Sequence, residues 1–184
     1  MTMSANDRIP APAESGGRMP RQIPYIIGNE ACERFSFYGM RNILTPFLIT
    51  SLLLSYPLAE RAGLAKEVFH TFAIGVYFFP LLGGWLSDRY FGKYRTVLWL
   101  SLVYCVGHAF LAFFEDNRTG FYTGLFLIAL GSGGIKPLVS AFVGDQFDQS
   151  NKHKAKIVYD AFYWTINFGS FFASLLMPRI LAAW

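Results

Sequence analysis

Apolar residues in this chain are gathered into long blocks instead of being scattered at the spacing of a soluble core. A helix needs about 20 apolar residues to cross the ~30 Å of hydrocarbon in a bilayer. Blocks of that kind predict helices at residues 24–54, 67–85, 97–114, 121–143 and 157–184. Because no block alternates polar and apolar residues with a period of two, we expect an all-α polytopic membrane protein and not a barrel.

Composition agrees with this fold class. Of the 184 residues 53% are hydrophobic and only 15% are charged, well below the ~25% charged share of a soluble domain, and the mean hydropathy is +0.33. Residues 1–22 contain no apolar run and are rich in Pro, Ala, Gly and Ser, so we expect a disordered cytoplasmic tail and no signal peptide. Residues 23–184 are expected to form one transmembrane bundle.

The distribution of cations predicts the orientation. With a cytoplasmic N-terminus, the inner segments hold most of the basic residues: Arg8, Arg18, Arg21, Arg89, Lys93, Arg95, Lys152, Lys154 and Lys156. The outer segments hold four: Arg61, Lys66, Arg118 and Arg179. The positive-inside rule therefore places the N-terminus in the cytoplasm. We expect an integral protein of the cytoplasmic (inner) membrane. The net charge of +4 needs no nucleic-acid partner, since the cations lie in short loops beside the helices. The last apolar block ends at Trp184 without a polar anchor, which suggests a fragment of a longer protein.

The first block carries an unusual group of charges. At about 100° per residue, Glu30, Glu33, Arg34 and Arg41 share one face of the helix. A charge at mid-membrane costs ~2.5 to 3.5 kcal/mol on insertion scales. One interpretation is a Glu30–Arg34 ion pair that only fixes packing, which would leave Glu33 and Arg41 without partners in their own helix. We favour the other, that this face lines a watery cavity.

Two later blocks carry polar residues at similar depth. The stretch "GSGGIKPL" places Lys136 inside the fourth block, beside glycines that allow close helix approach. In the fifth block, Asp160, Tyr163 or Trp164, and Asn167 repeat at helical spacing. Each of these residues could serve only to form hydrogen bonds between helices, but three helices with polar faces favour a shared cavity.

Three motifs carry a resemblance to a known family. The pattern ExxERFxFYG at Glu30–Gly39 is similar to the first-helix signature of the proton-dependent oligopeptide transporters, a branch of the major facilitator superfamily. "GGWLSDRYFGKYRT" resembles the superfamily loop between helices two and three, and "FYWTINFGS" at Phe162–Ser170 resembles the family's fifth-helix signature. The match runs from about residue 23 to the end. Phe37 departs from the pattern, which has Tyr there.

The resemblance implies twelve helices in two halves, with five of the six helices of the N-terminal half present here. It implies a symporter that couples proton entry to uptake of di- and tripeptides by alternating access. The residues it assigns to proton coupling are Glu30, Glu33, Arg34, Lys136 and His70. Those it assigns to the peptide are Arg34, Tyr38, Arg41, Tyr77, Lys136, Tyr163 and Asn167. Lys136 would alternate between Glu33 and the substrate carboxylate. The expected partners are small peptides, protons, the lipid bilayer and the remaining C-terminal half of the transporter.

The turn between the second and third blocks suggests a separate role. We interpret Asp88, Arg89 and Lys93 as a conformational latch at the cytoplasmic side, against the simpler alternative of a positive-inside loop.

Other function classes fit less well. An enzyme would need a nucleophile with a base or a metal cluster, and His70, His108 and His153 are too scattered to build one, so we expect no enzyme, metal or cofactor. Cys32 and Cys105 lack metal-type spacing and are expected to be small apolar residues. A structural membrane subunit would leave the intramembrane charges unexplained. A proton-coupled carrier of another solute such as nitrate stays open as an alternative, though the glutamates disfavour it.

Topology is directly testable. A reporter fused before Pro24, or between Asp148 and Lys156, is expected in the cytoplasm, because those segments hold the inner cations. A reporter near Asp116 is expected outside. Accessibility labelling in intact cells measures both, and a cytoplasmic reporter at Asp116 would contradict the helix assignment.

Overall fold

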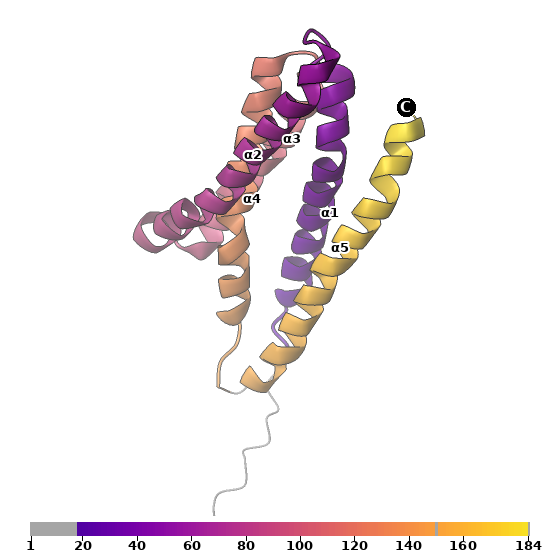
Figure 1. Cartoon of the computed structure of the whole chain (residues 1–184). Coiled ribbons are helices and arrows are strands. Elements are labelled where there is room, and N and C mark those ends of the chain that lie inside the picture. The colour runs from indigo at the N-terminus through magenta and orange to yellow at the C-terminus, as the bar shows by residue number, and fades with distance from the viewer. Residues whose placement is uncertain (1–17, 150, 184) are drawn as a thin grey trace, which may run out of the picture.

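The computed structural model describes residues 18–149 and 151–183, and they form a bundle of long helices (Figure 1). The bounds are α1 Ile23–Phe47, α2 Leu58–Leu86, α3 Lys93–Phe113, α4 Arg118–Gly144 and α5 Ala155–Ala183. Residues 1–17 of the expected tail and Trp184 lie outside the described residues. Pro24 near the start of α1 and the Asn117 side chain, which accepts a hydrogen bond from the Gly120 backbone at 3.0 Å, mark two helix starts.

Short segments of other helical type extend three of these helices. The π-helical turns η1 (Leu48–Leu52) and η2 (Ser87–Phe91) follow α1 and α2, and the 3-10 turn η3 (Lys152–Lys154) precedes α5. Gly92, with a φ of 74°, separates η2 from α3. A side chain would be strained at that angle, so glycine allows the sharp turn between the two helices.

The start of α2 differs from the sequence expectation. We expected a polar connection up to residue 66, but the helix begins at Leu58, directly after Pro57. Arg61 lies inside the helix and donates hydrogen bonds to the backbone carbonyls of Tyr56 and Leu54, both at 2.9 Å. Arg61 thereby pairs two backbone carbonyls of the connection between η1 and α2, and the helix extends beyond its apolar part.

The helices pack in two groups that meet at α1. α4 packs against α2 and α3, while α5 packs along α1, as the ribbon also shows (Figure 1). One hydrophobic core lies among α1, α2 and α4 and includes Leu44, Leu48 and Ile128, all almost fully buried. A second core near the start of α1 includes Ile23, Ile135 and Phe162. Apolar packing therefore contributes to holding α1 between α4 and α5.

Two glycines let α4 fit tightly between its neighbours. A Cβ at Gly131 would lie 2.7 Å from the Tyr104 Cβ and 2.8 Å from the Leu100 carbonyl oxygen of α3. A Cβ at Gly133 would lie 2.8 Å from the Val76 carbonyl oxygen of α2. The sequence prediction that these glycines permit close approach agrees with this packing. The residue between them, Ser132, faces α1, where its hydroxyl donates a hydrogen bond to Glu33.

The connections separate to two ends of the bundle. At one end, Asn151 before η3 donates a hydrogen bond to the Arg18 carbonyl, and Lys93 of α3 contacts Asp145 after α4. At the other end, Arg118 of α4 hydrogen-bonds Ser55 and lies 4.6 Å from the Tyr56 ring centroid. The segments in which we expected the inner cations are therefore grouped at one end.

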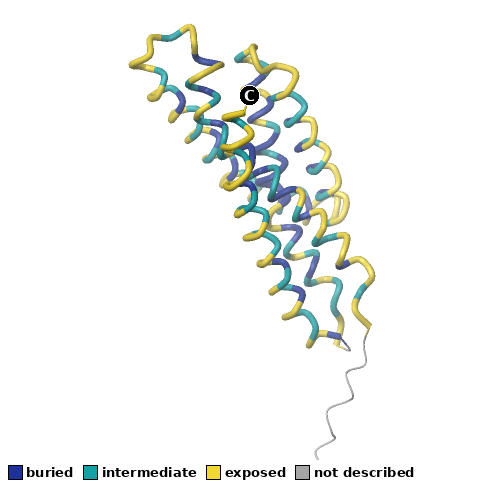
Figure 2. Tube along the Cα trace, turned by 90° about the vertical axis from the view of Figure 1, so that its right-hand side faces the viewer, coloured by how far each residue is buried: buried dark blue, intermediate teal, exposed yellow. Residues whose placement is uncertain are grey.

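Large apolar side chains cover much of the outer surface. Tyr77, Phe113 and Trp164 are 74%, 82% and 74% exposed, and exposed residues follow the outer faces of all helices (Figure 2). By length and composition, four helical segments in the described part are apolar enough to cross a membrane: Leu58–Phe91, Lys93–Phe113, Arg118–Gly144 and Lys152–Ala183. α1 is not among these segments, and it carries the charged residues Glu30, Glu33, Arg34 and Arg41.

The glycine packing leads to a prediction. Gly131→Ala should destabilise the bundle by about 1 to 3 kcal/mol, because the added methyl overlaps the backbone of α3. The matched control is Gly84→Ala in α2, where a Cβ meets nothing within 4 Å. Thermal unfolding in detergent compares the two, and equal stability of both variants would show that α3 can retreat from α4 without cost.

Candidate functional site

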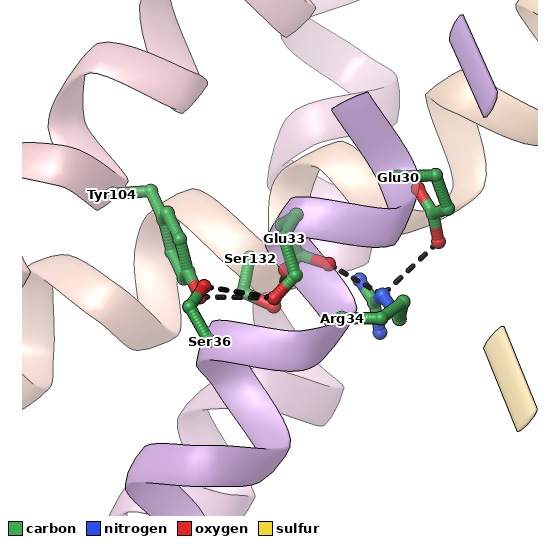
Figure 3. Close-up of polar contacts among 6 residues, drawn as sticks. All are labelled: Glu30, Glu33, Arg34, Ser36, Tyr104 and Ser132. Carbon is green, nitrogen blue, oxygen red and sulfur yellow. Dashed lines mark hydrogen bonds and ion pairs between the residues drawn. The ribbon is translucent and has the colours of Figure 1, made fainter. Parts of the chain in front are cut away.

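Three charged side chains of α1 form a buried cluster, the carboxylate cluster, made of Glu30, Glu33 and Arg34. They are 3%, 7% and 2% exposed. The Arg34 Nε lies 3.0 Å from Glu30 Oε1 and also contacts Glu33 Oε2 (Figure 3). The sequence argument that Glu33 would lack a partner in its own helix is therefore wrong. The long Arg34 side chain reaches both carboxylates, one of them its immediate neighbour.

Side chains from α3 and α4 hold Glu33 from the other side. Ser132 of α4 donates a hydrogen bond to Glu33 Oε1 at 2.7 Å. The Tyr104 hydroxyl of α3 donates to the Glu33 backbone carbonyl at 3.2 Å and lies 2.6 Å from the Ser36 hydroxyl (Figure 3). The sequence analysis missed these three residues. Ser132 lies within the glycine-rich stretch that we had interpreted as packing, and Tyr104 is uncharged.

The cluster retains unused hydrogen-bonding capacity. Among the described residues, Glu30 Oε2 and Arg34 Nη2 are buried without a hydrogen-bond partner. Buried polar groups are normally paired, and an unpaired one needs an explanation. Two carboxylates against one guanidinium also leave one negative charge in excess when both are ionised. The cluster is therefore suited to accept one more positive charge, either a proton or a further cation.

A small cavity adjoins the cluster and is rich in cations. It measures about 80 Å³, and five predicted substrate residues line it: Arg34, Tyr38, Arg41, Tyr77 and Lys136. The Lys136 Nζ lies 5.9 Å from the Tyr77 ring centroid, and the Arg41 guanidinium lies 5.5 Å from the Phe69 ring centroid. No ion pair joins Lys136 to Glu33 in the described part of the chain, and the Lys136 side chain is exposed. Arg34 thus belongs to both the carboxylate cluster and the cavity.

The polar residues of α5 lie elsewhere. Tyr163 and Asn167 are exposed and do not line this cavity. The Asn167 side chain donates to the Tyr163 carbonyl of its own helix at 2.8 Å. What α5 places beside the cluster is Gly169, where an added Cβ would lie 3.4 Å from the Arg34 Cβ. The predicted substrate role of Tyr163 and Asn167 stays a prediction.

Neither His70 nor the turn after α2 lines this cavity. His70 is exposed, and its ring stands edge-on to the neighbouring Phe69. Asp88 and Arg89 are exposed, whereas the Lys93 Nζ lies 2.6 Å from Asp145 Oδ2. The partner of Lys93 is thus the end of α4, which the sequence analysis did not identify.

Metal and disulfide chemistry finds no support in the part of the chain that the structure describes. No group of three His, Cys, Asp or Glu residues there could hold a metal ion. Cys32 and Cys105 are free and exposed.

Comparison with known proteins places these motifs in context. Residues 94–183 match the model of a family described as the POT family. The chain is 42% identical over 170 residues to "Peptide transporter family 1" of Drosophila melanogaster, covering 89% of this chain and 22% of that protein. It is 38% identical over 176 residues to "Solute carrier family 15 member 2" of Danio rerio, covering 91% of this chain and 24% of the relative.

Solved structures agree in fold. The POT family transporter PepTSo superimposes with a TM-score of 0.89 at 75% identity, over 90% of this chain and 33% of that one. An auto-inhibited POT family peptide transporter gives a TM-score of 0.85 at 71% identity, over 89% and 32%. The chain therefore spans about a quarter of the length of these curated relatives and about a third of these solved structures.

The buried ion pairs lead to a second prediction. Arg34→Ala should lower the free energy of unfolding by about 3 to 5 kcal/mol, because two buried carboxylates lose their cation. The comparison variant is Lys93→Ala, whose ion pair with Asp145 is partly exposed and should contribute less than about 1 kcal/mol. Chemical unfolding in detergent measures both, and a mild effect of Arg34→Ala would indicate that the carboxylates bind protons instead.

Proposed function

We propose that the chain belongs to the POT family and that it is the N-terminal part of a transporter that couples proton entry to uptake of di- and tripeptides. The structural neighbours identify its fold as an all-α membrane bundle of the major facilitator type, with five helices of the N-terminal half among the described residues. The observation that supports the activity best is the position of Arg34. It pairs with Glu30 and Glu33 on one side and lines the cation-rich cavity on the other.

The cavity fits one end of the substrate. A peptide at neutral pH is a zwitterion, so its site needs a cation for the carboxylate and an anion for the ammonium group. Arg34, Arg41 and Lys136 supply an excess of cations, so this part of the protein binds the carboxylate end. At about 80 Å³ the cavity is far smaller than the ~300 Å³ of a typical ligand pocket. The ammonium end therefore meets groups outside this chain segment.

The excess negative charge of the carboxylate cluster explains the coupling. The cluster is neutral overall when it holds one proton, or when Lys136 approaches Glu33. When the substrate carboxylate attracts Lys136, that compensation is lost and a proton must replace it. Substrate and proton then bind cooperatively, as thermodynamic linkage requires. In the structure the Lys136 Nζ lies 5.9 Å from the Tyr77 ring centroid, and among the described residues the Glu33 carboxylate contacts Arg34 and Ser132.

The remaining assignments follow the same model. The N-terminus lies in the cytoplasm, and the protein resides in the cytoplasmic membrane with its lipid-exposed aromatic surface. Asp88, Arg89 and Lys93 form the conformational latch at the cytoplasmic end, where Lys93 already contacts Asp145. His70 and the α5 residues Tyr163 and Asn167 contribute in other states of the cycle.

The decisive experiment uses the complete transporter in reconstituted vesicles. Glu33→Gln should abolish uptake driven by a pH gradient, because a neutral side chain cannot take up or release the proton. Exchange of labelled for unlabelled peptide should survive, since exchange needs no net proton movement. Normal gradient-driven uptake by this variant would remove Glu33 from the coupling role.

Two companion variants separate binding from coupling in the same vesicles. Arg41→Ala should weaken peptide binding by about 1.5 to 3 kcal/mol, the contribution of a hydrogen bond to a charged group. The remaining uptake should still depend on the pH gradient. Lys136→Ala should impair both uptake and exchange, because Lys136 serves the substrate and Glu33 in turn. Nitrate uptake in place of peptide uptake by the unmodified protein would favour the alternative carrier.

A further inference from the structure

We propose that Ser132 and Tyr104 are positioning residues that hold Glu33 against Arg34 and so determine the pH range in which the transporter works. This inference rests on the proposed role of Glu33 in proton coupling. It concerns two uncharged residues of α4 and α3 that touch Glu33 at two different points. Together they hold Glu33 at both its side chain and its backbone (Figure 3).

Ser132 acts on the carboxylate itself. Its side chain is 1% exposed, and its hydroxyl donates to Glu33 Oε1 at 2.7 Å. Gly131 and Gly133 on either side allow α4 to approach α3 and α2 closely, while the Ser132 hydroxyl faces α1. With Oε1 bound to Ser132, the other oxygen, Oε2, is the one that contacts Arg34. The serine thereby selects which oxygen meets the guanidinium.

Tyr104 acts on the backbone of the same residue. It is 6% exposed, and its hydroxyl reaches the Glu33 carbonyl at 3.2 Å. Ser36, one turn further along α1, donates to that carbonyl at 3.0 Å and lies 2.6 Å from the Tyr104 hydroxyl. The Tyr104 hydroxyl, the Ser36 hydroxyl and the Glu33 carbonyl thus connect α3 to the turn of α1 that carries Glu33. A rotation of that turn would break it and carry Glu33 away from Ser132.

The charged and titratable groups around Glu33 come from three helices. Glu30 and Arg34 belong to α1, Lys136 to α4 and Tyr104 to α3. From α2, Tyr77 faces Lys136, and from α5 it is Gly169 that packs beside Arg34. Ser132 is thus the uncharged donor to the carboxylate. A donor favours the charged form of a carboxylate, so removing it lets Glu33 take up a proton at higher pH.

The test uses the complete transporter and follows peptide affinity as a function of pH. Ser132→Ala is expected to shift the midpoint upward by about one pH unit, the size expected for one lost hydrogen bond to a charged group. Tyr104→Phe, which removes a single oxygen, should shift it in the same direction by less. Ser132→Thr retains the hydroxyl and should restore the original midpoint.

The matched control is Ser87→Ala. Ser87 is also buried at 3% exposure, but its hydroxyl has no hydrogen-bond partner among the described residues, so its removal should leave the midpoint unchanged. Peptide exchange measured in parallel reports whether each variant is folded. If Ser132→Ala does not fold, Tyr104→Phe carries the test alone. An unchanged midpoint in a folded Ser132→Ala or Tyr104→Phe protein overturns the inference.

A double variant separates this inference from the proposed function. In a Glu33→Gln background, Ser132→Ala should add no shift, because the group through which it acts can no longer titrate. A shift that persists in that background shows that Ser132 acts through another residue and overturns the inference, while the role of Glu33 stands. If Glu33→Gln itself leaves the pH dependence unaltered, the proposed role of Glu33 fails, and the inference fails with it.

Discussion

The structure depends on one guanidinium that serves two buried carboxylates. Taking ions out of water is costly, and attraction between them repays that cost only with close geometry and further hydrogen bonds. Arg34 provides the geometry, since it contacts both Glu30 and Glu33 of its own helix. It does not provide neutrality, because two negative charges meet one positive charge. The cluster therefore carries one excess negative charge when both carboxylates are ionised. A proton or the Lys136 ammonium can neutralise it.

Close packing around α4 determines which residues lie beside the negatively charged cluster. Ser132 and Lys136 lie four residues apart, so they occupy the same face of the helix. The glycines at 131 and 133 fix that face by allowing α3 and α2 to touch the α4 backbone. One helix therefore presents both a neutral donor, which already holds Glu33, and a cation, which is exposed beside the cavity. Because both residues belong to α4, a movement of that helix relative to α1 displaces both, while the long Lys136 side chain can still turn by itself.

Much of this could be predicted from the sequence, and the misses have physical causes. Apolar blocks predict the helices, and charges at helical spacing predict one charged face on the first helix, because both are periodic signals. The sequence favoured a watery cavity along that face, whereas Glu30, Glu33 and Arg34 are buried and paired with one another. The start of α2 was placed too late, because polar side chains such as Arg61 extend the helix past its apolar part. The Arg34–Glu33 pair was missed, because adjacent helical residues point apart and only a long side chain can curl back. Ser132 and Tyr104 were missed, because a hydrogen bond between distant helices leaves no periodic trace.

Under the proposed role of Glu33, the same geometry implies that a small displacement of α4 would alter proton binding strongly. Glu33 is held by Arg34 from its own helix and by Ser132 from α4, and these two contacts respond differently to a movement of α4 relative to α1. The Arg34 contact would survive, because it lies within one helix. The Ser132 bond would lengthen, and Lys136 on the same face of α4 would change its distance from Glu33 at the same time. Hydrogen bonds weaken steeply with poor geometry, and charge interactions are strong in a buried site. A shift of α4 therefore changes the hydrogen bond from Ser132 and the distance of Lys136 at the same time. Both changes act on the proton affinity of Glu33.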